Sequence, residues 1–201
     1  IEGPIFSQAN YLSFIKDGVG LNVLLRNYWM VIHPPILFLG FASTIIPFAF
    51  AYAGIQTKRF GDWVTPALPW ALFSACVLGV GIMMGGKWAY ESLSFGGYWA
   101  WDPVENASLV PWLILIAGLH TMVIYKATGH SLKASYLFAF LSFIFILYST
   151  FLTRTGVLGD TSVHAFTENG DAISFKLLGK VISFKVLNAM IGLFLAAFII
   201  P

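Results

Sequence analysis

The sequence predicts an all-α integral membrane protein, a polytopic bundle of about five transmembrane helices with an external aromatic loop. The composition is the first reason: 58% of the 201 residues are hydrophobic and only 10% are charged, whereas a soluble domain carries about 25% charged residues. The second is that several uncharged stretches reach the roughly 20 residues needed to cross a bilayer. The third is a loop dense in aromatic residues between two of these stretches.

Five uncharged windows define the expected spans, and the last of them runs to the final residue: 27–57, 63–86, 106–125, 134–153 and 186–201. Helices are expected because backbone groups in lipid must be satisfied within their own segment. The opening "IEGPIFSQAN" has neither the basic nor the apolar region of a signal peptide. We therefore interpret the chain as an internal piece of a longer membrane protein.

Loop charge predicts the orientation. The short loops 57–62 and 126–133 each carry two basic residues, and the long 86–105 loop carries only Lys87. Since positive charge concentrates on the cytoplasmic side, the aromatic loop is expected outside. Lys176, Lys180 and Lys185 argue against this, because they fall in a segment that the same topology places outside.

The expected organisation has two parts. Residues 1–32 form an external segment with a surface helix at 17–32, whose apolar residues follow helical spacing. Residues 33–201 form the transmembrane bundle, which contains the external loop at 86–106 and a second external segment at 154–185.

Charge and cysteine content exclude some functions. A net charge of +2 is too small to indicate nucleic-acid binding. The single cysteine, Cys76, excludes a disulfide framework and a CxxCH haem-attachment motif. Any haem would therefore be held non-covalently.

Part of the aromatic stretch "GGYWAWDPVENASLVPW" has a structural interpretation. Asp102 fits a helix N-cap, Pro103 the first helical position and Glu105 the third, which is a capping-box pattern. Tyr and Trp also gather at membrane interfaces. This explanation leaves no need for Asp102 and Glu105 to act as an acid–base pair.

The density of rings exceeds what a membrane belt needs. Seven large rings lie within a short stretch: Trp88, Tyr90, Phe95, Tyr98, Trp99, Trp101 and Trp112. Gly96 and Gly97 allow close backbone approach. Such a surface suits a flat apolar ligand, for which porphyrin is the obvious candidate.

The histidines suggest iron ligands, because imidazole is the usual axial ligand of haem. On the predicted topology, His33 and His164 lie at the same outer face as the aromatic loop, although each could merely cap or anchor a helix. His120 lies inside the third span, where an ionisable residue indicates function. His130 fits a solvated loop. Lys87 and Arg154, at outer span ends, are possible partners of haem propionates or ordinary interfacial charges.

Several motifs resemble one family. "FGGYWAWDPVENASLVPWL" resembles the WWD signature of the haem-handling proteins of cytochrome c biogenesis. Within that superfamily (CcmF, CcmC and CcsA), "HPPILFLGF", "KWAYESLSFGGYWAWDPVENAS", "GLH" and "TRTGVLGDTSVHAF" look like the CcmF haem-lyase branch. The likeness runs from about Gly18 to Phe166.

The resemblance implies roles for particular residues. His33 and His164 match the external histidines that ligate the haem being transferred. His120 matches the first of two transmembrane histidines that bind a permanent haem b, and nothing in this chain corresponds to the second. The residues implied at the external haem site are His33, His164, Trp88, Gly96, Gly97, Tyr98, Trp99, Trp101, Asp102, Pro103, Glu105 and Asn106.

The implied activity is that of a cytochrome c haem lyase acting within a complex. Its cofactor would be non-covalent haem b, and its partners would be a CcmE-like haem chaperone, an apocytochrome c with a CxxCH motif, a CcmH-like thiol-reducing subunit and membrane lipid. The implied location is the bacterial inner membrane, with the haem site on the periplasmic side.

Three alternatives stay open at this point. A CcsA-type cytochrome c synthase or haem exporter shares the WWD core. A membrane b-type electron-transfer cytochrome would need a pair of intramembrane histidines, and only His120 is available. A transporter or structural bundle would use its aromatic loop as an interface belt.

Overall fold

The computed structural model describes residues 23–92, 96–154, 162, 172–177 and 180–185. A short 3-10 turn, η1 (Val23–Leu25), precedes five α-helices and a β-hairpin. The helices are α2 (Tyr28–Ser43), α3 (Ile45–Gln56), α4 (Val64–Ser92), α5 (Pro103–Thr128) and α6 (Leu132–Arg154). The strands are β1 (Ala172–Leu177) and β2 (Lys180–Lys185).

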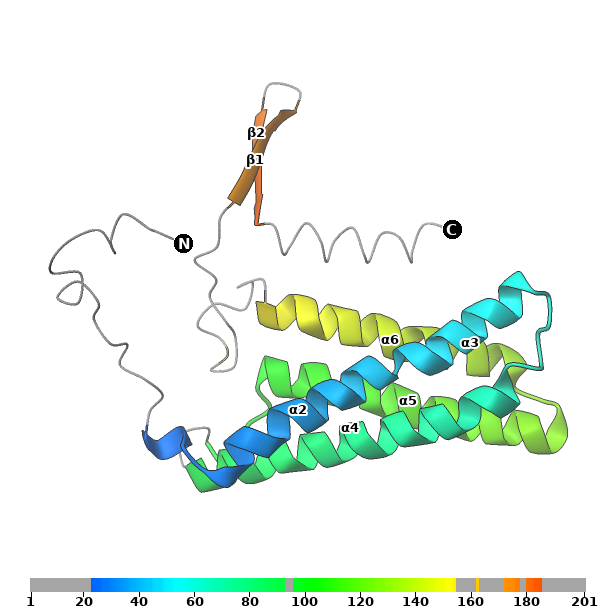
Figure 1. Ribbon diagram of the computed structural model, residues 1–201, viewed down its shortest axis with the longest axis horizontal. Helices are drawn as coiled ribbons and strands as arrows, with labels where there is room; N and C mark the ends of the chain where they lie inside the picture. The colour runs from blue at the N-terminus through cyan, green and yellow to red at the C-terminus, as the bar shows by residue number, and fades with distance from the viewer. Residues whose placement is uncertain (1–22, 93–95, 155–161, 163–171, 178–179, 186–201) are drawn as a thin grey trace, which may run out of the picture.

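The bundle contains four long apolar spans, as the sequence predicts. They are Tyr28–Gln56, Val64–Ser92, Pro103–Thr128 and Leu132–Thr153, each long and apolar enough to cross a membrane. Successive spans run in opposite directions, so the start of α2, the end of α4, the start of α5 and the end of α6 share one end of the bundle (Figure 1). We call this the aromatic end. The expected fifth span, 186–201, lies outside the described residues.

The first span is divided into α2 and α3 at Thr44, which is fully buried and donates its hydroxyl to the Phe41 carbonyl at 2.7 Å. Pro47 explains the interruption, because a proline has no N–H for the carbonyl four residues earlier and its ring clashes there. That carbonyl belongs to Ser43, the last residue of α2.

The start of the first span differs from expectation. Residues 28–32, expected on a surface helix at 17–32, belong to α2. Asn27 sets the boundary, because its backbone is extended and its side chain accepts a hydrogen bond from the Met30 amide at 3.2 Å. An asparagine in this position caps a helix N-terminus. Residues 17–22 lie outside the described part of the chain.

Glycines allow α2 and α4 to pack closely. A Cβ atom at Gly40 would lie 2.6 Å from the Cα of Leu78, and one at Gly81 would lie 2.8 Å from the Cα of Leu37. Gly81 and Gly85 have the small-xxx-small spacing typical of close helix contacts in membranes. The contact fixes how far α2 stands from α4.

Enlarging this interface will destabilise the bundle. In Gly40→Val, the new side chain meets backbone atoms that cannot rotate away, and such overpacking costs about 1–3 kcal/mol or more. We expect a clearly lower Tm in detergent. Ala42→Val is the matched control, because Ala42 lies on the same helix with its side chain exposed. Equal Tm values for the two variants would contradict the close α2–α4 contact.

Small residues also line the contact of α6 with its neighbours. Ser135, Ser142 and Ser149 recur at intervals of seven and are all buried. Ser135 and Ser142 donate their hydroxyls to carbonyls of the turn before them, at 3.1 Å each. The hydroxyls of Ser135 and Ser142 are therefore satisfied by the backbone of their own segment, as a lipid environment requires.

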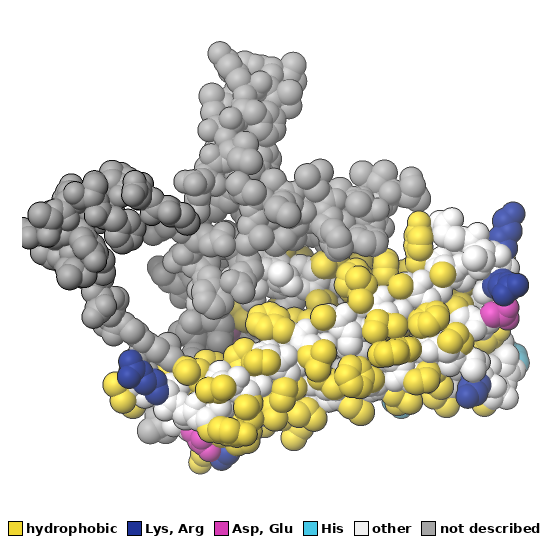
Figure 2. Space-filling view, viewed as in Figure 1, with side chains coloured by type: hydrophobic (Ala, Val, Ile, Leu, Met, Phe, Trp, Pro, Cys, Tyr) yellow, Lys and Arg dark blue, Asp and Glu magenta, His cyan; other side chains and the backbone are white. Residues whose placement is uncertain are grey.

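The surface of the bundle fits a membrane. Apolar side chains cover the long middle of the molecule, and the coloured charged side chains lie at its two ends (Figure 2). Leu113, Val123 and Leu137 are examples of large apolar side chains that are more than half exposed. In water such a surface would be a liability, whereas lipid chains solvate it.

The all-helical class is confirmed for the spanning part of the chain. The antiparallel hairpin is an addition that the sequence analysis did not predict; Ser174 pairs with Ser183 in its register. Its strands repeat "ISFK" at 173–176 and 182–185, an alternation of apolar and polar residues that favours strands.

Candidate haem site at the aromatic end

The aromatic loop is shorter than expected. α4 continues to Ser92 and α5 begins at Pro103, so Lys87, Trp88 and Tyr90 lie on α4. Lys87 and Glu91 form an i,i+4 ion pair on this last part of α4, with Nζ 2.9 Å from the carboxylate. Such a pair adds a small stabilisation to a helix. The described part of the loop is residues 96–102.

His33 is held with one ring nitrogen directed at α4. Its Nδ1 lies 2.8 Å from the Gly81 carbonyl oxygen, and the ring is half-buried. A carbonyl can only accept, so Nδ1 carries the proton and Nε2 keeps its lone pair. This arrangement is the usual one for a metal-ligating histidine, whose second nitrogen is fixed by a backbone carbonyl. A Cβ at Gly85 would lie 2.7 Å from the ring, so only glycine admits the ring there.

Trp88 packs beside His33. Their ring centroids are 5.9 Å apart with the planes tilted by 46°. The indole N–H of Trp88 donates to the Leu25 carbonyl at 3.0 Å, which ties the end of α4 to the turn η1. Trp88 therefore has a structural function, and its ring also forms one wall beside the imidazole.

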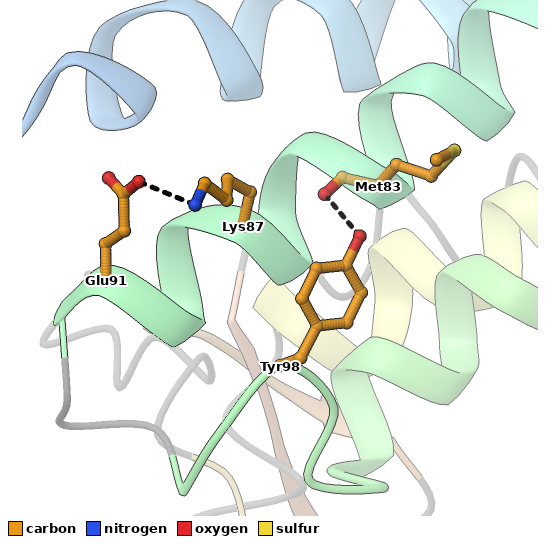
Figure 3. A network of polar contacts seen from close by, with 4 residues as sticks. All are labelled: Met83, Lys87, Glu91 and Tyr98. Atoms are coloured by element: carbon orange, nitrogen blue, oxygen red, sulfur yellow. Dashed lines mark hydrogen bonds and ion pairs between the residues drawn. The ribbon is translucent and has the colours of Figure 1, made fainter.

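Tyr98 fastens the loop to α4, as Figure 3 shows. Its hydroxyl donates to the Met83 carbonyl at 3.1 Å. Gly86 makes room for the ring, because a Cβ there would lie 2.6 Å from the Cε1 of Tyr98. Gly85 and Gly86 are adjacent, so His33 and Tyr98 pack against neighbouring positions of one helix.

A methyl group at Gly86 will displace the loop. In Gly86→Ala the Tyr98 ring must shift and its bond to Met83 is lost, so the amides of residues 96–101 should exchange about fivefold faster, the effect of one hydrogen bond. Hydrogen exchange read by mass spectrometry measures this. Val80→Ala, which alters an exposed side chain on the same helix, should leave the exchange unchanged. Unchanged exchange in Gly86→Ala would show that Tyr98 does not hold the loop.

Three residues of the loop have left-handed backbone conformations: Gly96 (φ 81°), Gly97 (φ 127°) and Trp101 (φ 58°). The glycines adopt them at little cost. A tryptophan in this region is strained by about 1–3 kcal/mol, and such strain clusters at functional sites. The Trp101 ring is 72% exposed, so burial of the ring does not compensate the strain.

The predicted capping box is confirmed. Asp102 caps α5 and accepts a hydrogen bond from the Val104 amide at 3.0 Å. Glu105 accepts from the amides of Asp102 at 3.2 Å and Ala100 at 3.0 Å. Asn106 donates its side-chain amide to the Trp101 carbonyl at 3.0 Å. These polar side chains therefore bind the loop backbone, and this is the function the structure shows for them.

Trp99 carries a buried donor without an acceptor. Its indole N–H is inaccessible to solvent and has no hydrogen-bond partner within the part of the chain that the structure describes. The ring meets Trp101 edge to face, with centroids 6.3 Å apart. Since an unsatisfied buried donor costs about 1–3 kcal/mol, an acceptor group on a bound ligand would stabilise this position.

Ser162 reaches the loop from beyond α6. It is buried, and its hydroxyl donates at 2.8 Å to Asp102 Oδ2, the same oxygen that accepts from the Val104 amide. The sequence analysis missed this residue, because no local pattern links positions 60 apart. His164 itself lies outside the described residues, so its expected place opposite His33 stays a prediction.

Lys87 and Arg154 are the two possible partners of the haem propionates, and the structure describes the side chain of Lys87 only. Lys87 pairs with Glu91 and also lies 5.7 Å from the centroid of the Tyr90 ring. Both side chains of that pair are partly exposed, so the pair is weak and exchangeable. Arg154 ends α6, and its side chain lies outside the described part.

His120 lies within the third span, as predicted, and its side chain is exposed on the surface of α5. Its Nδ1 is 2.8 Å from the Ile116 carbonyl, which again leaves Nε2 with the lone pair. His130 lies exposed in the loop between α5 and α6, where a solvated residue was expected.

Comparison with known proteins decides the family. Residues 5–158 match the family described as "Cytochrome C assembly protein". The chain belongs to this family.

Relatives in this family match most of this chain, but the match covers only about a quarter of their own length. "Cytochrome c-type biogenesis protein CcmF" of Pseudomonas aeruginosa is 42% identical over 154 residues, which are 76% of this chain and 23% of that protein. The Escherichia coli protein of the same name is 38% identical over 158 residues, 78% and 24% of the two chains.

A solved structure, "Cytochrome c Heme Lyase CcmF", is also similar. It has a TM-score of 0.60 and 42% identity, covering 68% of this chain and 23% of that one. The chain thus spans about a quarter of the length of the relatives it matches, and corresponds to a CcmF-type portion of the family. Its four spans and its bacterial relatives together indicate a bacterial membrane protein.

Proposed function

We propose that this chain forms the haem-presenting part of a cytochrome c haem lyase. Its substrate haem would bind at the aromatic end, with His33 Nε2 as one iron ligand and His164 as the other. The single observation that carries the proposal is the bond from His33 Nδ1 to the Gly81 carbonyl. It leaves Nε2 as the nitrogen that can ligate iron.

The surrounding residues fit a porphyrin. Trp88 stands beside the imidazole, Tyr98 packs on the same helix, and Trp99 and Trp101 offer two further ring faces. Large aromatic rings provide the stacking area a flat ligand needs. The Trp99 indole N–H, which has no acceptor of its own, suits an anionic propionate edge. The Lys87 ammonium could release the Glu91 carboxylate and pair with the second haem propionate instead.

The chemistry to be catalysed is addition of a thiol across a vinyl group. For each thioether, one S–C bond forms to a vinyl carbon and the thiol hydrogen ends on the other vinyl carbon, so no net oxidation or reduction takes place. The residues of this chain would hold the haem and orient its vinyl groups toward the cysteines of a CxxCH motif. Correct positioning of two reactants can itself supply a large acceleration.

A second haem would lie in the membrane. His120 has an exposed side chain on α5, and its Nδ1 lies beside the Ile116 carbonyl. A second axial ligand would come from outside the described residues. This haem b would be permanent and non-covalent, in contrast to the transferred one.

The partners and location follow from the same proposal. The external site would receive haem from a CcmE-like chaperone and pass it to an apocytochrome c reduced by a CcmH-like subunit. Lys58, Arg59, Lys126 and Lys133 lie at the end opposite the aromatic one. By the positive-inside rule, that end would face the cytoplasm and the haem site the periplasm.

The test is a reduced-minus-oxidised absorption spectrum of the purified full-length protein, recorded for wild type, for His33→Ala with His164→Ala, and for His120→Ala. A haem component lost only in the external double variant would support the proposal. If all of the haem signal survives there even after loading from the chaperone, and vanishes in His120→Ala, the aromatic end holds no haem and the proposal fails. His130→Ala is the control, since His130 is exposed at the opposite end.

A further inference from the structure

The residues after the loop hold its most exposed ring in place. We infer that Asp102, Glu105 and Asn106 are positioning residues, which keep Trp101 in a left-handed conformation with its ring exposed and fasten the chain at Ser162 to the loop. This inference rests on the proposed function, because it assigns the exposed ring to the haem-handling surface. It assigns these three side chains no contact with haem.

The first step of the argument is that the Trp101 conformation needs an external cause. Its φ of 58° is strained for a tryptophan, and its ring is 72% exposed, so packing does not impose it. A strained residue persists only where its surroundings over-determine it. Here side chains bind the amides of the residues before and after Trp101 and the carbonyl of Trp101 itself.

The second step is that the cap supplies those bonds. Glu105 accepts from the amides of Ala100 and Asp102, which are the residues before and after Trp101. Asn106 donates to the carbonyl of Trp101 itself at 3.0 Å. In an ordinary capping box, the side chain at the third helical position binds the N-cap amide alone. The bonds to Ala100 and Trp101 therefore exceed what capping α5 requires.

The third step concerns Asp102, whose side chain binds both the first turn of α5 and Ser162. Its Oδ2 accepts from the Val104 amide at 3.0 Å and from the Ser162 hydroxyl at 2.8 Å. Ser162 is only 7% exposed. The same carboxylate that caps α5 therefore also binds Ser162, which lies 60 residues further along the chain.

The experiment uses the full-length protein labelled with 5-fluorotryptophan and read by fluorine NMR, with the Trp101 signal assigned from Trp101→Phe. Asn106→Ala removes the amide that binds the Trp101 carbonyl. The matched control is Thr128→Ala, which removes a side-chain hydrogen bond of 2.8 Å at the other end of the same helix. We expect the Trp101 signal to shift or split in Asn106→Ala and to stay in place in Thr128→Ala.

The functional readout is cytochrome c yield and haem content in the same variants. Loss of one hydrogen bond corresponds to a population shift of about fivefold, and we expect the yield to fall by about that factor in Asn106→Ala. Glu105→Gln, which keeps the shape of the side chain without its charge, should shift the signal less in the same direction. It serves as the test if Asn106→Ala does not fold.

An unmoved Trp101 signal in both variants would overturn the inference, as would a moved signal with unchanged yield and haem content. Failure of the proposed function is recognised separately, because Trp101→Ala would then leave haem content and yield at the wild-type level. Ser162→Ala tests the second contact. A fall in haem content that Ser162→Thr restores would support it, and unchanged haem content would overturn that part.

Discussion

Replacing Trp99 or Trp101 with alanine will weaken haem binding at the aromatic end by about 30-fold, which corresponds to the roughly 2 kcal/mol of an aromatic contact in a binding hot spot. The yield of holocytochrome c should fall with it. The physical reason is loss of stacking area, and for Trp99 also loss of a buried indole N–H that has no acceptor among the described residues. The measurement is c-type haem per cell in a strain without the native gene.

Two sets of controls separate this prediction from a membrane-belt function. Trp70 is another exposed tryptophan, near the opposite end of α4, and Trp70→Ala should be nearly neutral. An interfacial belt accepts tyrosine in place of tryptophan, so the belt interpretation expects Trp99→Tyr and Trp101→Tyr to be silent. Full yield in the alanine variants would return the loop to that interpretation.

On the proposed function, replacing His33 with glutamine is expected to abolish stable haem binding at the aromatic end. A glutamine amide can still donate to the Gly81 carbonyl, but it offers iron no imidazole. The loss should exceed the roughly 10–100-fold that removal of a ligand's hydrogen-bond partner costs. Haem content and the Soret spectrum of the purified protein measure it.

Exogenous imidazole distinguishes a ligand from a structural residue. His33→Ala leaves space beside Gly85, and added imidazole should restore part of the haem signal there but not in His33→Gln, whose side chain still fills the site. Wild-type haem content in His33→Gln would show that the contact with Gly81 is the whole function of His33.

Local sequence patterns were enough for the helices and one cap. The windows 106–125 and 134–153 correspond to α5 and α6, since hydropathy acts along a single segment. The Asp102–Glu105 capping box was predicted within four residues of sequence and is present. The extent of α4 was underestimated, because the uncharged window ends before Lys87, which instead lies on the helix and pairs with Glu91.

For part of the candidate site, the sequence predicted which residues take part but not which positions they pack against. His33, Trp88 and Tyr98 were singled out as aromatic or ligating residues; His33 and Tyr98 pack on α4, and Trp88 belongs to that helix. The glycines that receive them, Gly81, Gly85 and Gly86, were not selected. The small-xxx-small spacing of Gly81 and Gly85 could have revealed the helix contact, though not which side chain would use it.

By itself, the sequence determined that the chain spans a membrane, roughly where four of its spans lie, how α5 is capped, and which residue types could handle a porphyrin. These follow from composition and from interactions within a few residues. Only the tertiary structure decided that His33 is oriented by Gly81, that Trp101 is held in a left-handed conformation, and that Ser162 binds Asp102. The contacts with Gly81 and Ser162 join residues 48 and 60 positions apart. Such contacts depend on how closely helices approach, which side-chain volume at the glycines sets and no local pattern encodes.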